Sequence, residues 1–149
     1  MDLAARMLKT RWIVRLPIGI YRAGFGFVFG GRLLMLEHLG RSSKKWRQVV
    51  LEVADREDRD TVVIASGFGR HAQWYRNLEA DPRCIVSVGA IQRRRARAEL
   101  LGEDESRRLL GRYAARHPAA WKMLDQAIRD ATGEADPYIP MVRLRLEPA

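Results

Sequence analysis

A series of short apolar runs separated by tight polar turns constrains the fold of this chain more than any other feature. Two runs flank a Gly/Ser/Lys-rich turn at residues 40–45, which is the pattern of a β-hairpin. The run at 61–65 (Thr-Val-Val-Ile-Ala) is β-branched and typical of a buried strand. Short strands joined by tight turns predict a small barrel or sandwich, and disfavour a doubly wound parallel sheet. The expected strands are residues 32–39, 48–54, 61–65, 84–88, 91–101 and 141–146.

Helical patterns occupy the remaining segments, so the expected class is α+β, mainly β with helices. Pro17 ends a pattern that starts near Leu3, and a second short helix is expected at residues 18–29. Further helices are expected at 73–80, at 103–116, and from Pro118 to about residue 131 with Gly133 as the stop. Residues 55–60 are expected to form a polar turn. With 149 residues, we expect a single domain over 1–149, with residues 1–31 as a helical segment packed on or extending from it.

The positive charge is concentrated in the first third of the chain. The formal net charge is +9, and residues 1–50 hold 10 basic and 2 acidic side chains. A basic segment can bind nucleic acid, an anionic membrane or a multiply charged small ligand, and charge alone does not distinguish these ligands. Residues 18–36 are apolar, but Arg22 and Arg32 disfavour a membrane span. A helix packed on its own domain is favoured over contact of the basic, aromatic N-terminus with a membrane surface.

Several chemistries have little support in this sequence. The single cysteine, Cys84, excludes a disulfide framework and is expected to be a buried strand residue. His38, His71 and His117 lack metal-ligand spacing, so no metal site is predicted, and only His71 is a candidate for ligand contact. No Gly-x-Ser-x-Gly nucleophile segment is present. The four arginines at 93, 94, 95 and 97 alternate along a strand without aromatic partners, which indicates a solvated face and no nucleic acid.

Two loops hold the strongest functional signal. Residues 40–47 offer cations, hydroxyls and backbone N–H groups, which suit phosphate or carboxylate groups. Residues 65–69 (Ala-Ser-Gly-Phe-Gly) allow a planar ligand to approach the backbone closely, since glycine has no Cβ.

Together these segments resemble the deazaflavin-dependent nitroreductase and quinone reductase family. The similar residues are Gly40-Arg41-x-Ser43, Arg47, Ala65-Ser66-Gly67-x-Gly69, Trp74-Tyr75-x-Asn77-Leu78-x-Ala80-x-Pro82 and Ile139-Pro140-Met141-Val142. The resemblance implies an FMN-binding split-barrel-like fold, that is, a split β-barrel, and binding of reduced coenzyme F-420. The chain departs from the family pattern at Ser42, Lys44, Trp46 and Val50, where lysine, glycine and two prolines are usual. FMN is the runner-up cofactor, and a haem-type ligand stays open.

The resemblance also implies roles for single residues. Phosphate or the acidic tail of the cofactor is expected to face Arg41, Ser43, Lys45 and Arg47. Backbone groups of Val50, Leu51 and Glu52 are expected to line the ring, with Ala65, Ser66 and Gly67 on its other side and with Trp74 and Asn77 as the wall. No catalytic side chain is assigned, and Tyr113 and Tyr138 are both candidate proton donors.

The expected function is therefore hydride transfer from reduced coenzyme F-420 to a quinone or nitroaromatic acceptor. The alternatives are a non-catalytic cofactor-binding protein, an FMN- or haem-binding split barrel, and nucleic-acid binding by the basic segment. The expected partners are a small-molecule electron acceptor and a second copy of the chain in a homodimer. We expect a cytoplasmic location, with membrane contact at the cytoplasmic face left open.

Overall fold

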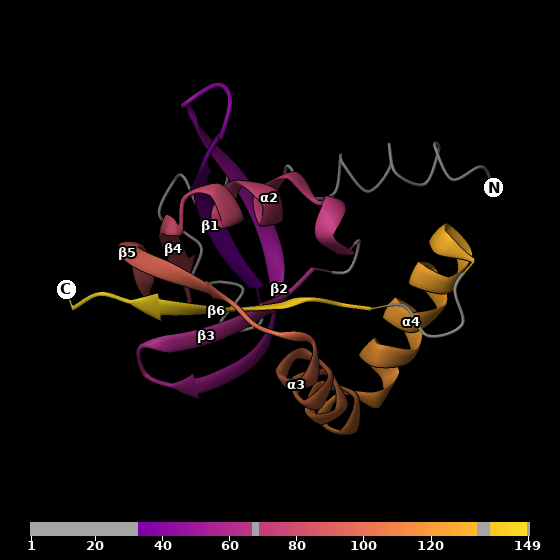
Figure 1. Cartoon of the computed structure of the whole chain (residues 1–149). Coiled ribbons are helices and arrows are strands. Elements are labelled where there is room, and N and C mark those ends of the chain that lie inside the picture. Colours follow the sequence, from indigo (N-terminus) through magenta and orange to yellow (C-terminus); the bar gives the residue numbers. More distant parts are fainter. Residues whose placement is uncertain (1–32, 67–68, 134–137, 149) are drawn as a thin grey trace.

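Six antiparallel strands close into a barrel. The computed structural model describes residues 33–66, 69–133 and 138–148, so the expected helices of segment 1–31 and the expected site residue Gly67 lie outside the described residues. The barrel order is β1-β2-β3-β6-β5-β4 (Figure 1). This confirms the predicted split β-barrel. The strands are β1 Leu33–Leu39, β2 Trp46–Asp58, β3 Thr61–Ala65, β4 Arg83–Val88, β5 Ile91–Leu100 and β6 Met141–Leu146.

The described helices follow the predicted order along the chain. They are η2 Gly69–His71, α2 Gln73–Ala80, α3 Glu103–Arg116 and α4 Pro118–Thr132. Helix α3 begins with three acidic residues, which its N-terminal dipole favours. Proline opens α4, and Gly133 ends it in the left-handed region at φ 71°, which glycine adopts without a Cβ penalty. In Figure 1, α3 and α4 lie together at one side of the barrel, while α2 lies across its other end.

The prediction for residues 55–60 is wrong, because β2 continues through Asp58 and only residues 59–60 turn. The charged residues that indicate a turn in the sequence have partners in the folded barrel. Asp55 accepts a hydrogen bond from Arg116 at 3.0 Å, and Glu57 pairs with Arg143 of β6. Two register shifts between β2 and β3 accompany this polar half of the strand. Distant arginines thus keep an acidic segment in the sheet.

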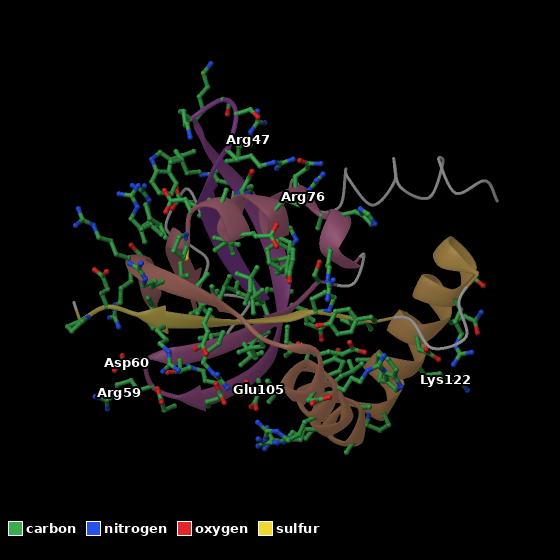
Figure 2. All side chains as sticks on the ribbon, in the orientation of Figure 1. Arg47, Arg59, Asp60, Arg76, Glu105 and Lys122 are labelled. Carbon is green, nitrogen blue, oxygen red and sulfur yellow. The ribbon has the colours of Figure 1, made fainter. Side chains whose placement is uncertain are left out.

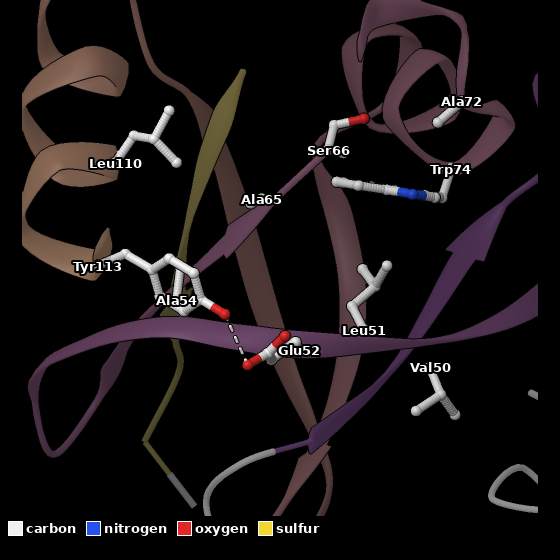
Figure 3. Close-up of a pocket in the computed structure, with 10 residues that line it drawn as sticks. All are labelled: Val50, Leu51, Glu52, Ala54, Ala65, Ser66, Ala72, Trp74, Leu110 and Tyr113. Carbon is white, nitrogen blue, oxygen red and sulfur yellow. Dashed lines mark hydrogen bonds between the residues drawn. The ribbon is translucent and has the colours of Figure 1, made fainter. Parts of the chain in front are cut away.

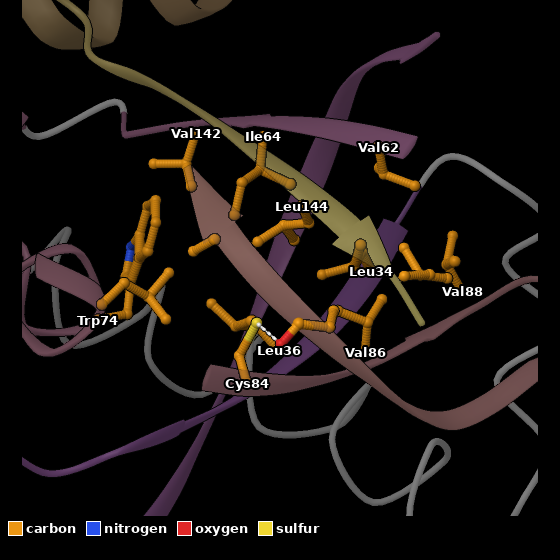
Figure 4. Close-up of a cluster of buried hydrophobic side chains, with 14 of the residues drawn as sticks. Leu34, Leu36, Val62, Ile64, Trp74, Cys84, Val86, Val88, Val142 and Leu144 are labelled. Carbon is orange, nitrogen blue, oxygen red and sulfur yellow. Dashed lines mark hydrogen bonds between the residues drawn. The ribbon is translucent and has the colours of Figure 1, made fainter. Parts of the chain in front are cut away.

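Alternate residues of the strands fill the barrel interior (Figure 4). Leu34 and Leu36 of β1, and Val62 and Ile64 of β3, are fully buried there. The residues between them face outward, which is the period of two that strands impose. A second cluster lies on the outer face, where Leu109 and Tyr113 of α3 pack against β-strand residues. Helix α3 is therefore fixed on the outside of the barrel wall.

Cys84 is buried in the barrel interior, as predicted. Its thiol contacts the carbonyl of Ala96 at 3.6 Å, and burial raises the pKa of the thiol to about 12. Since only the thiolate is nucleophilic, we expect a thiol reagent to modify the folded protein at least about 100-fold more slowly than the guanidinium-unfolded protein. Timed absorbance with a chromogenic disulfide reagent measures both rates. Equal rates would contradict this placement.

Candidate functional site

A cavity of about 220 Å³ lies beside β2, near the end of β3 (Figure 3). Its walls come from β2, from the end of β3, from the start of α2 and from α3. Most of the lining side chains are apolar, and the polar ones are a carboxylate, a hydroxyl and a phenol. The lining residues are Val50, Leu51, Glu52, Ala54, Ala65, Ser66, Ala72, Trp74, Leu110 and Tyr113.

The cavity lies where β2 and β3 separate. Their pairing runs from Asp58↔Thr61 to Val53↔Ile64, so Val50, Leu51 and Glu52 lie beyond the last paired position. On its other side the same stretch of β2 pairs with β1, from Leu33↔Glu52 through Met35↔Val50. One edge of this stretch of β2 is therefore bound within the sheet, while the edge toward β3 has no sheet partner among the described residues. This opening exposes strand backbone to a ligand.

Trp74 forms a flat wall of the cavity. The residue is only 7% exposed and packs against the barrel core, with the Tyr75 ring edge-on at 6.0 Å between centroids. In Figure 3 the indole lies between Ser66 and Leu51. A rigid aromatic plane next to open strand backbone suits a planar ring system.

Tyr113 places a polar group on the opposite wall. Its phenol donates a hydrogen bond to Oε1 of Glu52 at 2.8 Å, which joins α3 to β2 across the cavity (Figure 3). The Tyr113 ring also contacts His117 at 5.3 Å between centroids. Glu52 and Tyr113 together place a fixed carboxylate and a phenol beside the apolar lining of the cavity.

The basic hairpin between β1 and β2 is attached to α2 through Arg41. The Arg41 guanidinium donates to Asn77 Oδ1 at 2.8 Å and to Gln73 Oε1 at 2.9 Å, and its backbone N–H donates to the same Asn77 oxygen. The turn itself is tight, because a Cβ on Gly40 would lie 2.3 Å from Ser43 Oγ and 3.3 Å from the Lys45 carbonyl. Lys45 and Arg47 are exposed beyond this turn. Figure 2 shows Arg47 on the hairpin, close to its projecting tip.

Asn77 and His38 form a buried contact behind this hairpin. The residues are 3% exposed each, and Asn77 Nδ2 lies 2.9 Å from His38 Nδ1. Burial, and secondarily the nearby positive charge of Arg47, lowers the pKa of His38 to about 4. His38 is therefore a neutral structural histidine at neutral pH.

The structure brings together half of the residues predicted for the site. Val50, Leu51, Glu52, Ala65, Ser66 and Trp74 share the cavity wall. Arg41, Ser43, Lys45 and Arg47 lie instead on the hairpin, and Asn77 is buried between the hairpin and His38. The sequence did not assign Ala54, Ala72 or Leu110 to this wall, and it named Tyr113 only as a candidate proton donor. Leu110 and Tyr113 stand three residues apart on one amphipathic helix, a signal that indicates a buried face but not its partner strand.

The metal-binding and membrane-spanning potential of the chain is described here for residues 33–66, 69–133 and 138–148. They contain no group of three or more histidine, cysteine or acidic side chains placed to hold a metal ion. Within the same ranges, no helix is both long and apolar enough to cross a bilayer.

Residues 14–128 match the family model described as F420H(2)-dependent quinone reductase. The chain belongs to this family. The match covers most of the chain, and it makes the protein a deazaflavin-dependent oxidoreductase with coenzyme F-420 as the family's cofactor. A Mycobacterium tuberculosis protein named "Putative F420H(2)-dependent quinone reductase" is 37% identical over 89 residues, which are 59% of this chain and 74% of that protein.

Solved structures support the fold. The protein Atu2129, of unknown function, from Agrobacterium tumefaciens aligns with a TM-score of 0.58 and 23% identity over 87% of this chain. This chain spans only 55% of that protein. A structure titled as an F420-H2 dependent reductase aligns with a TM-score of 0.54 and 19% identity, over 76% of this chain and 94% of that one. At these identities the likeness shows the shared split barrel alone.

Proposed function

We propose that this oxidoreductase reduces a quinone or nitroaromatic acceptor that lies in the cavity beside Trp74, with reduced coenzyme F-420 bound across the opening between β2 and β3. The edge of β2 beyond Val53, which has no strand partner toward β3 among the described residues and lies next to a flat indole, carries the proposal. The cofactor supplies the hydride, and the protein binds and orients the reactants.

The cavity residues fit the ring of this cofactor. Beyond Val53 the strand offers backbone N–H and C=O groups in place of a neighbouring strand, and Val50, Leu51 and Glu52 are these positions. Ala65 and Ser66 end β3 on the other side of the opening, and Trp74 closes it. At about 220 Å³ the cavity is smaller than the ~300–1,000 Å³ typical of ligand pockets, so it takes a small acceptor beside a ring bound at the opening.

The hairpin fits the anionic end of the cofactor. Its exposed Lys45 and Arg47 carry positive charge beyond the Gly40 turn, and the Ser43 hydroxyl lies on the same turn. The two side-chain bonds of Arg41 to Gln73 and Asn77 of α2 hold this turn in one place relative to Trp74, which lies between these two partners in the helix. We assign Arg41 and Asn77 to positioning the hairpin, and the exposed cations to attracting phosphate and carboxylate.

A charge reversal on the hairpin tests the cofactor assignment. We expect Lys45→Glu to weaken reduced F-420 about tenfold or more, because it places a negative charge beside the anionic end of the cofactor. Lys122→Glu changes a lysine of α4 that is also exposed, makes the same charge change on a different element and is expected to leave the affinity for reduced F-420 unchanged (Figure 2). Anaerobic spectroscopic titration of the protein with reduced F-420, FMN and haem gives the affinities.

Addition of menadione or a nitroaromatic to the protein loaded with reduced F-420 then distinguishes an enzyme from a non-catalytic cofactor carrier. Oxidation of bound F-420 at a rate that rises with acceptor concentration is the expected result. Tight binding without acceptor-dependent oxidation would favour the non-catalytic alternative. Preference for FMN or haem over F-420, or equal effects of Lys45→Glu and Lys122→Glu, would contradict the proposal.

The expected homodimer, cytoplasmic location and contact with the cytoplasmic face of a membrane stay predictions. Light scattering of the full chain tests the first, and sedimentation with anionic vesicles tests the last.

A further inference from the structure

We propose that the phosphate of coenzyme F-420 binds between Arg47 of the hairpin and Arg76 of α2, on either side of the bridge that Arg41 forms between these two elements. Arg76 is then a cofactor contact of this chain beyond the hairpin cations. The inference rests on the proposed function, because it concerns the anionic end of the same cofactor.

Arg41 holds the hairpin against α2 without losing its charge. Its guanidinium donates to Gln73 Oε1 at 2.9 Å and to Asn77 Oδ1 at 2.8 Å. Both acceptors are neutral amides, so the bonds fix the guanidinium but do not neutralise it. The junction of hairpin and α2 therefore contains one fixed positive charge, next to the helix turn that begins at the cavity.

Arg76 lies on the side of α2 that faces this bridge. It follows Gln73 by three positions, and residues three apart are neighbours on one face of a helix. Gln73 and Arg76 are both exposed, whereas Trp74 and Tyr75 between them are buried. Among the described residues, the Arg76 guanidinium has no hydrogen bond or ion pair. Its donors are therefore available to a ligand beside the bridge.

Arg47 approaches the same junction from the hairpin. It is paired across the strands with His38, and residues paired in this way have their side chains on the same face of the sheet. His38 contacts Asn77 of α2 at 2.9 Å, so Arg47 lies on the face of the hairpin that is turned toward α2. A Cβ on Gly40 would lie 3.3 Å from Arg47 Nε, which places this side chain beside the residue that precedes Arg41. Figure 2 shows Arg47 and Arg76 at the same end of the molecule.

None of these three arginines has an acidic partner in the part of the chain that the structure describes. The acid nearest to Arg76 in sequence is Glu79, and no ion pair joins the two within the described residues. Residues 1–32 have six basic and one acidic side chain, so their net charge is also positive. Neighbouring cations repel each other, and a bound anion removes that repulsion. The paired N–H donors of a guanidinium match the oxygen atoms of a phosphate.

Two deazaflavins that differ at one end test the proposal. One is reduced F-420, and the other is its reduced analogue that ends in a hydroxyl group in place of the phosphate and the acidic tail. Quenching of tryptophan fluorescence under anaerobic conditions gives both affinities. We expect Arg76→Gln to weaken F-420 about tenfold and to change the affinity for the hydroxyl analogue by less than about twofold, because only F-420 presents an anion to this arginine.

Two further variants separate this site from general charge effects. Arg97→Gln removes an exposed arginine of β5 that also has no ion pair among the described residues, and it is expected to leave both affinities unchanged. Arg76→Lys keeps the charge but loses the paired donors of the guanidinium, so it is expected to recover only part of the affinity for F-420. In the unchanged protein, added salt is expected to weaken F-420 and not the hydroxyl analogue, and this measurement needs no variant to fold.

An unchanged affinity of Arg76→Gln for F-420 would overturn the proposal and leave the phosphate to the hairpin alone. Equal weakening of both deazaflavins would also overturn it, because a role of Arg76 in the structure of α2 affects the ring and the phosphate alike. So would an equal effect of Arg97→Gln. If the unchanged protein binds neither deazaflavin, the proposed function is contradicted, and this inference, which rests on it, is contradicted as well.

Discussion

Replacing Arg143 with alanine is expected to destabilise the folded protein by about 1.5–3 kcal/mol, the range for loss of hydrogen bonds to charged groups, because its glutamate partners are partly exposed. Arg143 lies in the middle of β6 and is 9% exposed. Its guanidinium donates to Glu57 of β2 and to Glu105 of α3, the latter at 2.8 Å, and lies 3.6 Å from Glu99 of β5. The hydrogen bonds to Glu57 and Glu105 raise the pKa of Arg143, so it stays charged.

Arg145 supplies the matched control two positions along the same strand. It pairs with Glu99 at 3.0 Å, but its side chain is 60% exposed, so Arg145→Ala is expected to cost less than about 1 kcal/mol. Urea denaturation followed by tryptophan fluorescence measures both changes. Arg143→Met, which fills the site with an apolar chain, still leaves three glutamates without the guanidinium and should also destabilise. Equal losses for Arg143 and Arg145 would show that the network adds nothing to a surface ion pair.

The same network explains which parts of the fold were predictable from the sequence. Strands β4 and β6 have apolar residues at alternate positions, whereas β1 and β3 contain continuous apolar runs. Such local patterns need no partner to be recognised. The second half of β2 has Asp55, Glu57 and Asp58, which locally favour a turn. It is a strand because Arg116 and Arg143, about sixty and ninety residues away in sequence, pair with it. No local pattern contains that information.

The candidate site likewise divides into residues predictable from local motifs and residues brought in by tertiary contacts. The similarity to known motifs was sufficient to group Val50, Leu51, Glu52, Ala65, Ser66 and Trp74, since these lie on strands and a short helix whose arrangement the barrel fixes. Tyr113 joins them only because α3 packs on the outer face of β2, a tertiary contact. Arg41 and Asn77 bind each other, which adds a structural role to two residues predicted to contact the cofactor.

Acidification is expected to reduce the stability of the protein between about pH 6.5 and 4 by up to about 3 kcal/mol through His38 alone. The imidazole has a pKa of about 4 in the folded protein, against 6.5 for an unburied histidine. Within this interval the unfolded chain binds more protons than the folded one, so stability rises with pH and is fully present above 6.5. Below about 4 both states are protonated, and this contribution falls no further.

The contact with Asn77 gives this loss a structural cause. Arg41 donates twice to Asn77 Oδ1, which turns the Asn77 amide N–H group toward His38 Nδ1. A proton on Nδ1 would therefore face another donor inside the protein, and the amide cannot reverse without breaking the bonds to Arg41.

Denaturation midpoints across this pH interval measure the effect. His38→Gln removes the titrating group and is expected to flatten the dependence, while His71→Gln, at an exposed position, is expected to retain it. Asn77→Asp tests the cause, because a carboxylate accepts from both Arg41 and a protonated His38. This variant should raise the pKa of His38 and make the protein relatively more stable toward pH 5. An unchanged profile for Asn77→Asp would mean that burial alone, and not the direction of the amide, keeps His38 neutral.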